Sequence, residues 1–153
     1  MKKIVTYVCV ALFGAVALSG SLQAGTDKEL KAFEAAIKEK YDLKVKAFAE
    51  NDADTIADKF YSEDVVSVDP SGKVTLGREA LRKEYEHIVP TATVSIESVH
   101  TFVDGDAGWD WANFHVTPTD PNEKPFTFII LFLWAKENGE WICKGDQYVV
   151  GEL

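Results

Sequence analysis

Cysteine is scarce in this sequence and occurs only as Cys9 and Cys143. Cys9 lies inside an N-terminal apolar segment that we expect to be removed, so no disulfide can form within the remaining chain. Cys143 stands between Ile142 and Lys144 in a segment typical of a β-strand. No nearby residue in the sequence would activate its thiol. We therefore interpret Cys143 as a small buried hydrophobic residue rather than a catalytic nucleophile.

Basic residues are also few, with 16 lysines and arginines against 25 aspartates and glutamates. The N-terminal segment holds two lysines and no acidic residue, so its removal takes the net charge from −9 to −11. Nucleic acids and anionic membrane surfaces are bound by clusters of basic residues. The composition therefore excludes a nucleic-acid partner and, once the leader is removed, a membrane partner.

Several motifs that carry chemistry are missing. The three histidines have no metal-binding spacing such as His-Glu-x-x-His, and no glycine-rich phosphate loop is present. A Gly-x-Ser-x-Gly nucleophile elbow is also absent. We therefore expect no metal and no cofactor, and any catalysis would rely on acid–base side chains.

The longest apolar run covers residues 4–18, after Lys2 and Lys3 and before a segment of small and polar residues that ends at Ala24. A membrane-spanning helix needs about 20 apolar residues, and this run is shorter. The pattern predicts a secretory signal peptide over residues 1–24, cleaved after Ala24. The alternative is a retained membrane anchor. We expect an exported chain, periplasmic or secreted, with one domain over residues 25–153.

The remaining chain alternates between two kinds of periodicity. Thr26 and Glu29 form a capping box, and apolar residues then recur every three or four positions up to Phe48, which predicts a long helix. A second helix follows Asn51-Asp52, and a short hairpin over 65–76 leads into a third helix over 78–89. Four further strands are predicted over 93–103, 107–117, 125–136 and 140–150. This order predicts an α+β fold.

The segment Phe128 to Ala135 is apolar on both faces of the predicted strand. A strand with one face in water should alternate, so both faces must be covered here. Helices can cover one face, and a second subunit is the simplest cover for the other. We therefore expect a homodimer through the convex sheet face, with these residues in or near the contact: Phe128, Ile130, Phe132 and Trp134.

Five short motifs in this order are similar to the nuclear transport factor 2-like superfamily, in particular to its SnoaL-like and ketosteroid-isomerase-like branch. They are Ala49-Glu50-Asn51-Asp52-Ala53-Asp54, Phe60-Tyr61-Ser62-Glu63-Asp64, Val68-Asp69-Pro70-Ser71-Gly72, Gly77-Arg78-Glu79-Ala80-Leu81 and Asn138-Gly139-Glu140-Trp141. The resemblance implies a cone: a curved antiparallel, cystatin-like sheet wrapped around the long helix, with two shorter helices. It also implies a pocket at the wide end and frequent dimerisation.

The resemblance places Asp69 where the isomerase branch keeps its carboxylate base. Burial in an apolar pocket would raise the pKa of that carboxyl. The alternative is that Asp69 only starts the turn at Ser71-Gly72. The tyrosine of the isomerases falls near Lys44 or Val45, and Tyr41 could replace it only with a shifted geometry. Their protonated acid falls near Leu131, so steroid isomerisation is disfavoured.

The strand over 107–117 supplies a second set of candidates. Trp111, Asn113 and His115 share one face with Trp109, and the resemblance turns that face into the cone. Lys144, Asp146 and Tyr148 would face inward from the last strand. Aromatic walls with a few polar groups are typical of small-molecule sites. The alternative is an ordinary core with internally satisfied hydrogen bonds.

Three functions therefore remain open. The chain could be an enzyme with Asp69 or His115 as base and Asp146 as partner, acting on a small, largely apolar molecule. It could bind such a molecule in the pocket without turning it over. It could also be a dimeric interaction module with a filled cone. A filled cone with no cavity would favour the third function.

Overall fold

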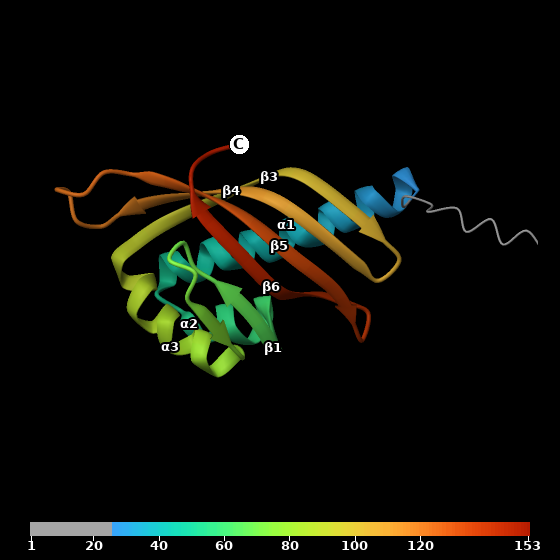
Figure 1. The fold of residues 1–153 in the computed structure, drawn as a ribbon, viewed down its shortest axis with the longest axis horizontal. Coiled ribbons are helices and arrows are strands. Elements are labelled where there is room, and N and C mark those ends of the chain that lie inside the picture. Colours follow the sequence, from blue (N-terminus) through green and yellow to red (C-terminus); the bar gives the residue numbers. More distant parts are fainter. Residues whose placement is uncertain (1–25) are drawn as a thin grey trace, which may run out of the picture.

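The computed structural model describes residues 26–153, and the predicted leader lies outside this range. The elements of this range are three short helical segments, two longer helices and six strands, in an α+β arrangement. Figure 1 shows the long helix α1 lying along the sheet, with α2 and α3 packed at one end of it, beside β1. The predicted fold class is confirmed.

The long helix α1 spans Asp27–Glu50 and begins as predicted. The Thr26 hydroxyl accepts a hydrogen bond from the Glu29 backbone, and the Glu29 carboxylate accepts one from the Thr26 backbone. Asn51 ends the helix in the left-handed conformation, with φ of 55°, which asparagine tolerates better than most residues. The apolar stripe of α1 faces the sheet, which fixes the orientation of every inward-pointing side chain on the helix.

The second predicted helix is shorter and less regular than expected. Asp52 caps α2 (Ala53–Thr55) by accepting from the Thr55 backbone and hydroxyl, and a π-helical turn follows over Ile56–Phe60. The chain then enters β1 (Tyr61–Val68) four residues earlier than the predicted strand. After β2 (Val74–Leu76), helix α3 covers Arg78–Ile88 and leads through a 3-10 turn at Val89–Thr91 into β3.

The six strands form one sheet in the order β2-β1-β6-β5-β4-β3. The four long strands are β3 (Ala92–Asp104), β4 (Ala107–Pro118), β5 (Phe126–Glu137) and β6 (Glu140–Val150), joined as antiparallel hairpins. One pair departs from the antiparallel expectation, because β1 runs parallel to β6. After the short helices, the chain therefore enters the sheet as β1 alongside β6, the last strand.

Two irregularities change which way side chains point. Ser98 pairs with Ala112 and His100 with Trp111, so Val99 is an extra residue in β3. Leu133 pairs with Gly145 and Trp134 with Cys143, so Lys144 is an extra residue in β6. A bulge of this kind reverses the alternation of side chains beyond it. Cys143 and Asp146 therefore both face inward, although three positions separate them.

The core lies between the concave face of the sheet and the helices. The inward side chains of β5 are Ile130, Phe132 and Trp134, which are 5%, 0% and 2% exposed. The expectation that they and Phe128 form a dimer contact is therefore wrong, because all four lie on the concave side of the sheet, towards the helices. Cys143 is fully buried, as predicted, and burial raises its thiol pKa well above the usual value.

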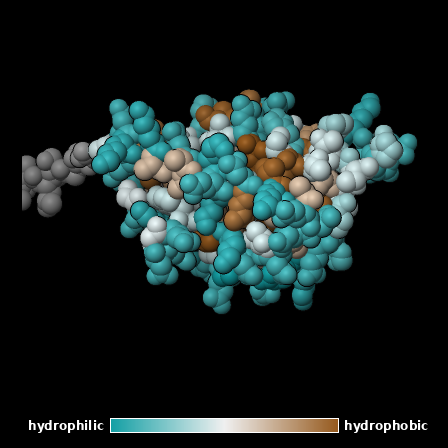
Figure 2. All heavy atoms as spheres, turned by 180° about the vertical axis from the view of Figure 1, so that it is seen from behind, coloured by the Kyte–Doolittle hydropathy of each residue, from teal (hydrophilic) through white to brown (hydrophobic). Residues whose placement is uncertain are grey.

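The outer surface is mixed. Figure 2 shows the side opposite to that of Figure 1: hydrophilic atoms cover most of it, and hydrophobic atoms gather near its centre. On the sheet face turned away from the helices, Phe102, Trp111 and Leu133 are 38%, 37% and 47% exposed. Among residues 26–153, no helix is long and apolar enough to cross a membrane.

Candidate functional site

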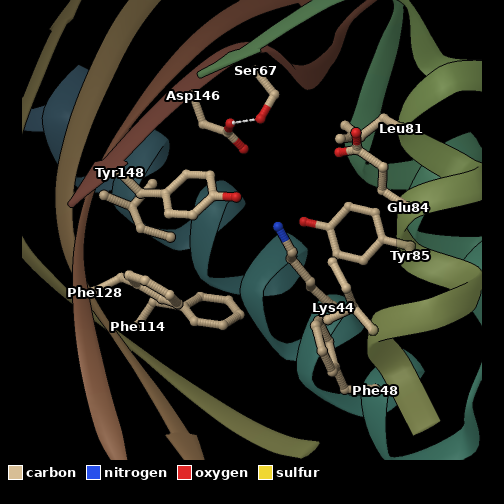
Figure 3. A pocket seen from close by; sticks show the side chains of 12 residues that line it. Lys44, Phe48, Ser67, Leu81, Glu84, Tyr85, Phe114, Phe128, Asp146 and Tyr148 are labelled. Atoms are coloured by element: carbon tan, nitrogen blue, oxygen red, sulfur yellow. Dashed lines mark hydrogen bonds between the residues drawn. The ribbon is translucent and has the colours of Figure 1, made fainter. Parts of the chain in front are cut away.

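A cavity of about 90 Å³ opens between the sheet and the helices α1 and α3. Its apolar wall comes from helices on one side and from β4, β5 and β6 on the other (Figure 3). The apolar lining residues are Phe48, Leu81, Ile88, Phe114, Phe128 and Ile130. The polar lining residues are Lys44, Ser67, Glu84, Tyr85, Asp146 and Tyr148. The cone is therefore hollow at this end.

Lys44 is the central polar residue of the cavity. It lies on the apolar stripe of α1 and is only 1% exposed. Its Nζ donates to the Tyr61 hydroxyl at 2.7 Å and lies over several aromatic rings, 4.3 Å from the centroid of Phe60. Burial lowers the pKa of Lys44 to about 8, and the nearby Asp146 carboxylate opposes that shift. A buried amine with this pKa is partly deprotonated near neutral pH, whereas an exposed lysine is almost fully protonated there.

Asp146 anchors a hydrogen-bond network beside this amine. Its Oδ2 accepts from the Tyr61 hydroxyl at 2.6 Å, and its Oδ1 accepts from the Ser67 hydroxyl at 2.5 Å (Figure 3 shows the Ser67 bond). Asp146 is 7% exposed, and Tyr61 is fully buried. Burial, with the Asp146 charge as the second cause, raises the pKa of Tyr61 well above its usual value. Tyr61 therefore stays a neutral donor to the carboxylate.

Two further tyrosines bring hydroxyl groups to the same space. The Tyr85 hydroxyl lies 3.0 Å from that of Tyr61. Figure 3 shows the hydroxyls of Tyr85 and Tyr148 pointing towards the Lys44 amine from opposite walls. Burial raises the pKa of Tyr85 well above its usual value and that of Tyr148 to about 12. Both hydroxyls therefore remain protonated at neutral pH. Because the one hydrogen of Tyr61 is donated to Asp146, Tyr85 is the donor in its bond with Tyr61, and the Tyr148 hydroxyl can donate to a bound acceptor.

Only two of the predicted site residues lie at this cavity, Asp146 and Tyr148. Asp69 lies in the β1–β2 turn, where its Oδ1 accepts from the Ser71 backbone and hydroxyl and from the Lys73 backbone. The Ser71 hydroxyl bond is the largest cause that lowers the pKa of Asp69. The expectation of a raised pKa is wrong, and the turn interpretation describes this residue.

The predicted orientation of β4 is also wrong. Asp110, Ala112 and Phe114 face the core, so Trp111 and His115 lie on the opposite, convex face. His115 Nδ1 is 2.9 Å from the Thr127 hydroxyl, and its Nε2 is 3.8 Å from Glu97. Aromatic residues occupy both faces of this strand, so the sequence pattern alone did not distinguish inside from outside.

Three other candidates are placed elsewhere. Asn113 is buried, but its side chain bonds the backbone of Leu153 at the C-terminus. Lys144, the bulge residue, points outward and pairs with Asp64 and Glu137. Tyr41 is buried in the core and donates to Asp110 at 2.5 Å, so it does not line the cavity.

Sequence reasoning missed Lys44, Tyr61, Ser67 and Tyr85. A signal for Lys44 was present, because it follows Tyr41 by three residues and precedes Phe48 by four, on the buried stripe. Tyr61 was interpreted as part of a helix end, whereas the π-turn over 56–60 places it at the start of β1. Within residues 26–153, no group of three or more His, Cys, Asp and Glu side chains is arranged to hold a metal ion.

The arrangement of a curved sheet around a long helix is shared with solved structures. A protein of unknown function from Mycobacterium tuberculosis matches with a TM-score of 0.71 and 20% identity, over 84% of this chain and 78% of that one. A ketosteroid isomerase-like protein from Erwinia carotovora matches with a TM-score of 0.66 and 19% identity, over 84% and 100%. A nuclear transport factor 2-like protein from Pseudomonas putida matches with a TM-score of 0.64 and 17% identity, over 78% and 87%.

These structures define the class: a nuclear transport factor 2-like fold. The similarity at these identities concerns the fold alone. The sequence profile of the SnoaL-like domain matches residues 43–143, which is most of the described chain. The chain therefore belongs to the SnoaL-like domain family, as the motifs predicted. The comparison with curated proteins gave no match.

Proposed function

We propose that this domain binds a small, largely apolar molecule in the cavity, with one acceptor oxygen of that molecule placed against the Lys44 amine. The observation that carries the proposal is a buried amine at the end of an apolar cavity (Figure 3). A buried charge is costly unless it is paired. Lys44 as an ammonium has three hydrogens, and one is donated to Tyr61. A ligand oxygen would accept another.

The dimensions favour a compact ligand. One water needs about 10–15 Å³ of such space, so a cavity of about 90 Å³ holds several waters or one small organic group. Phe48, Phe114 and Phe128 form walls that suit a ring or a short branched chain. The hydroxyl of Tyr148 would add a donor at the polar end. The ligand class is therefore a small carbonyl or carboxylate compound with an apolar body.

A second candidate function is cofactor-free acid–base catalysis in the same cavity, with Asp146 in place of the predicted Asp69 and His115. The Asp146 carboxylate lies at the cavity wall and connects through Tyr61 to the Lys44 amine. A carboxylate, an amine and a neutral hydroxyl in hydrogen-bond contact can pass a proton to or from a bound molecule.

The leader sequence further supports a role outside the cytoplasm, in a periplasm or the external medium.

Binding can be tested with three one-ring probes, followed by two-dimensional amide NMR. We expect benzoate and acetophenone to shift resonances of α1, α3 and β6, whereas benzylamine should not, because its ammonium would face Lys44. Two variants add bulk to the cavity: Leu81→Trp at its wall and Ile88→Trp where it meets solvent. Both should abolish the shifts.

Leu76→Trp is the matched control, because Leu76 is 67% exposed on β2 and does not line the cavity. It should bind the probes as the parent chain does. Equal shifts with benzoate and benzylamine, or unchanged binding in a folded Ile88→Trp variant, would contradict the proposal.

A further inference from the structure

We propose that Lys44 is a nucleophilic amine that condenses with small aldehydes in the cavity to form a Schiff base. This inference rests on the proposed function, because it names aldehydes as the substrate class of the same cavity. It does not follow from binding alone, since an amine can hold a carbonyl oxygen without attacking the carbon. Three features of the cavity favour attack.

The first feature is access within an apolar enclosure. Figure 3 shows the Lys44 side chain ending in the cavity with its nitrogen among the polar groups, while apolar side chains form the opposite wall. An aldehyde whose apolar body packs against Phe114 and Phe128 would bring its carbonyl end to Nζ. Holding the two reacting groups together replaces a bimolecular encounter by an internal one.

The second feature is the protonation state of the amine. Only the neutral amine carries the lone pair that attacks a carbonyl carbon. With a pKa of about 8, roughly a tenth of Lys44 is neutral at pH 7, against well under a thousandth for an ordinary exposed lysine. Burial among aromatic rings is the cause of this difference.

The third feature is a set of groups that can move the protons. Attack forms the Nζ–carbon bond, and the electron pair of the C=O bond moves to the oxygen. The Tyr148 hydroxyl, which points towards the Lys44 amine, would donate to that oxygen (Figure 3). Tyr61 accepts a hydrogen bond from Nζ and donates to Asp146, so it can take the amine proton while passing its own to the carboxylate.

The product of this step is a carbinolamine. Its hydroxyl then takes the proton held on Asp146 and leaves as water, the nitrogen lone pair forms the C=N bond, and the remaining Nζ proton returns to the Tyr148 phenolate. Nothing is oxidised or reduced, and one water is released for each imine formed. The reverse reaction returns the aldehyde and the free amine.

The test uses benzaldehyde with sodium cyanoborohydride, which reduces an imine to a stable secondary amine. Peptide mass mapping of the folded chain at pH 7 should find the benzyl group on Lys44 at a rate at least about tenfold above that on exposed Lys38 of the same helix. Acetophenone, as a cavity competitor, should slow labelling of Lys44 and leave Lys38 unchanged. Tyr148→Phe should slow Lys44 labelling by a larger factor than it weakens benzoate binding.

The outcomes separate the two proposals. Labelling of Lys44 no faster than Lys38, in a chain that binds benzoate, would overturn the Schiff base and leave the binding function standing. Absence of both benzoate binding and selective labelling would overturn both. In urea-unfolded chain the two lysines should react equally, and persistent preference for Lys44 there would also contradict a role for the cavity.

Discussion

Lys44 and Asp146 are joined through one shared atom, the hydroxyl oxygen of Tyr61. It lies 2.7 Å from the lysine Nζ and 2.6 Å from the aspartate Oδ2. The amine comes from α1, the hydroxyl from β1 and the carboxylate from β6. Two opposite charges are thus held in the core with a neutral donor between them, which keeps both near the cavity and lets a proton pass without direct contact.

The first prediction concerns this coupling. Lys44→Met should destabilise the fold by about 2 kcal/mol, because Asp146 is left buried without a nearby cation. Adding Asp146→Asn should restore about 1–2 kcal/mol, because the remaining amide is neutral. Urea unfolding of the two single variants and the double variant measures the coupling energy.

The exposed pair Lys38 and Asp42 on the same helix provides the matched cycle, since both side chains are more than half exposed. Lys38→Met and Asp42→Asn should couple by no more than about 0.5 kcal/mol. If the buried cycle were as small as the exposed one, Tyr61 would not transmit an interaction between the charges.

The second prediction concerns the other buried carboxyl, Asp110, which is fully buried and accepts from Tyr41 and Ser98. Burial raises its pKa from 3.8 to about 6, against the effect of those two hydrogen bonds. The folded chain therefore holds this proton more tightly than the unfolded chain. Stability should fall as the pH rises from about 4 to 6, by about 3 kcal/mol at 1.4 kcal/mol per pKa unit.

Asp110→Asn should remove this pH-dependent loss of stability. The free energy of unfolding of the variant, relative to that of the parent chain, should therefore be larger at pH 8 than at pH 4. Urea midpoints across that range measure the gain. Asp106→Asn, on the exposed β3–β4 turn, is the control and should track the parent chain. Parallel curves for parent and Asp110→Asn would show that the carboxyl keeps its ordinary pKa.

The third prediction retains the homodimer through the convex face and replaces its contact residues. Phe102 pairs with Trp109 and Trp109 with Leu133 across three strands, so these side chains lie on one face. Phe102 and Trp109 also stack, with ring centroids 5.6 Å apart. Exposed apolar groups gathered in this way are typical of interaction surfaces.

Leu133→Glu should therefore convert a dimer at micromolar concentration into a monomer, as measured by light scattering. Leu76→Glu, an equally apolar exposed position at the β2 edge, should remain dimeric. A parent chain that scatters as a monomer would rule the interface out.

The fourth prediction concerns the leader. Secretion of the chain by a bacterial host should yield a mature protein that begins at Gly25, because small residues precede the bond after Ala24. Intact-mass measurement distinguishes this product from a chain that keeps residues 1–24. A retained leader would favour the membrane-anchor alternative.

The helices and hairpins could be predicted because their signals are local. The Thr26–Glu29 capping box and the Asn138-Gly139 turn each depend on a few neighbouring residues. The boundary at Tyr61 could not, because the π-turn before it is held by packing against α1 and α3 rather than by a sequence pattern.

The site was harder to predict because it depends on which face of each strand points inward. The bulge at Lys144 turns that residue outward and keeps Asp146 inward, and the adjoining Gly145 was the only signal for it in the strand. In β4, Trp111 and Phe114 lie on opposite faces, so an aromatic side chain could mark either face as the buried one. Only the packing of Phe114 against Phe48 of the long helix shows that its face points inward. The inward orientation of Asp146 and Tyr148 was predicted because these residues lie beyond the bulge, where side chains alternate regularly along β6.

The parallel pairing of β1 with β6 has a consequence for when the domain can fold. The last strand lies inside the sheet, between β1 and β5, so the sheet stays divided until the C-terminal residues have been synthesised. Such distant pairings slow folding, because a long loop must close before they form. The cavity needs the same strand, because Asp146 and Tyr148 of β6 line it, so it cannot form before β6 has taken its place between β1 and β5.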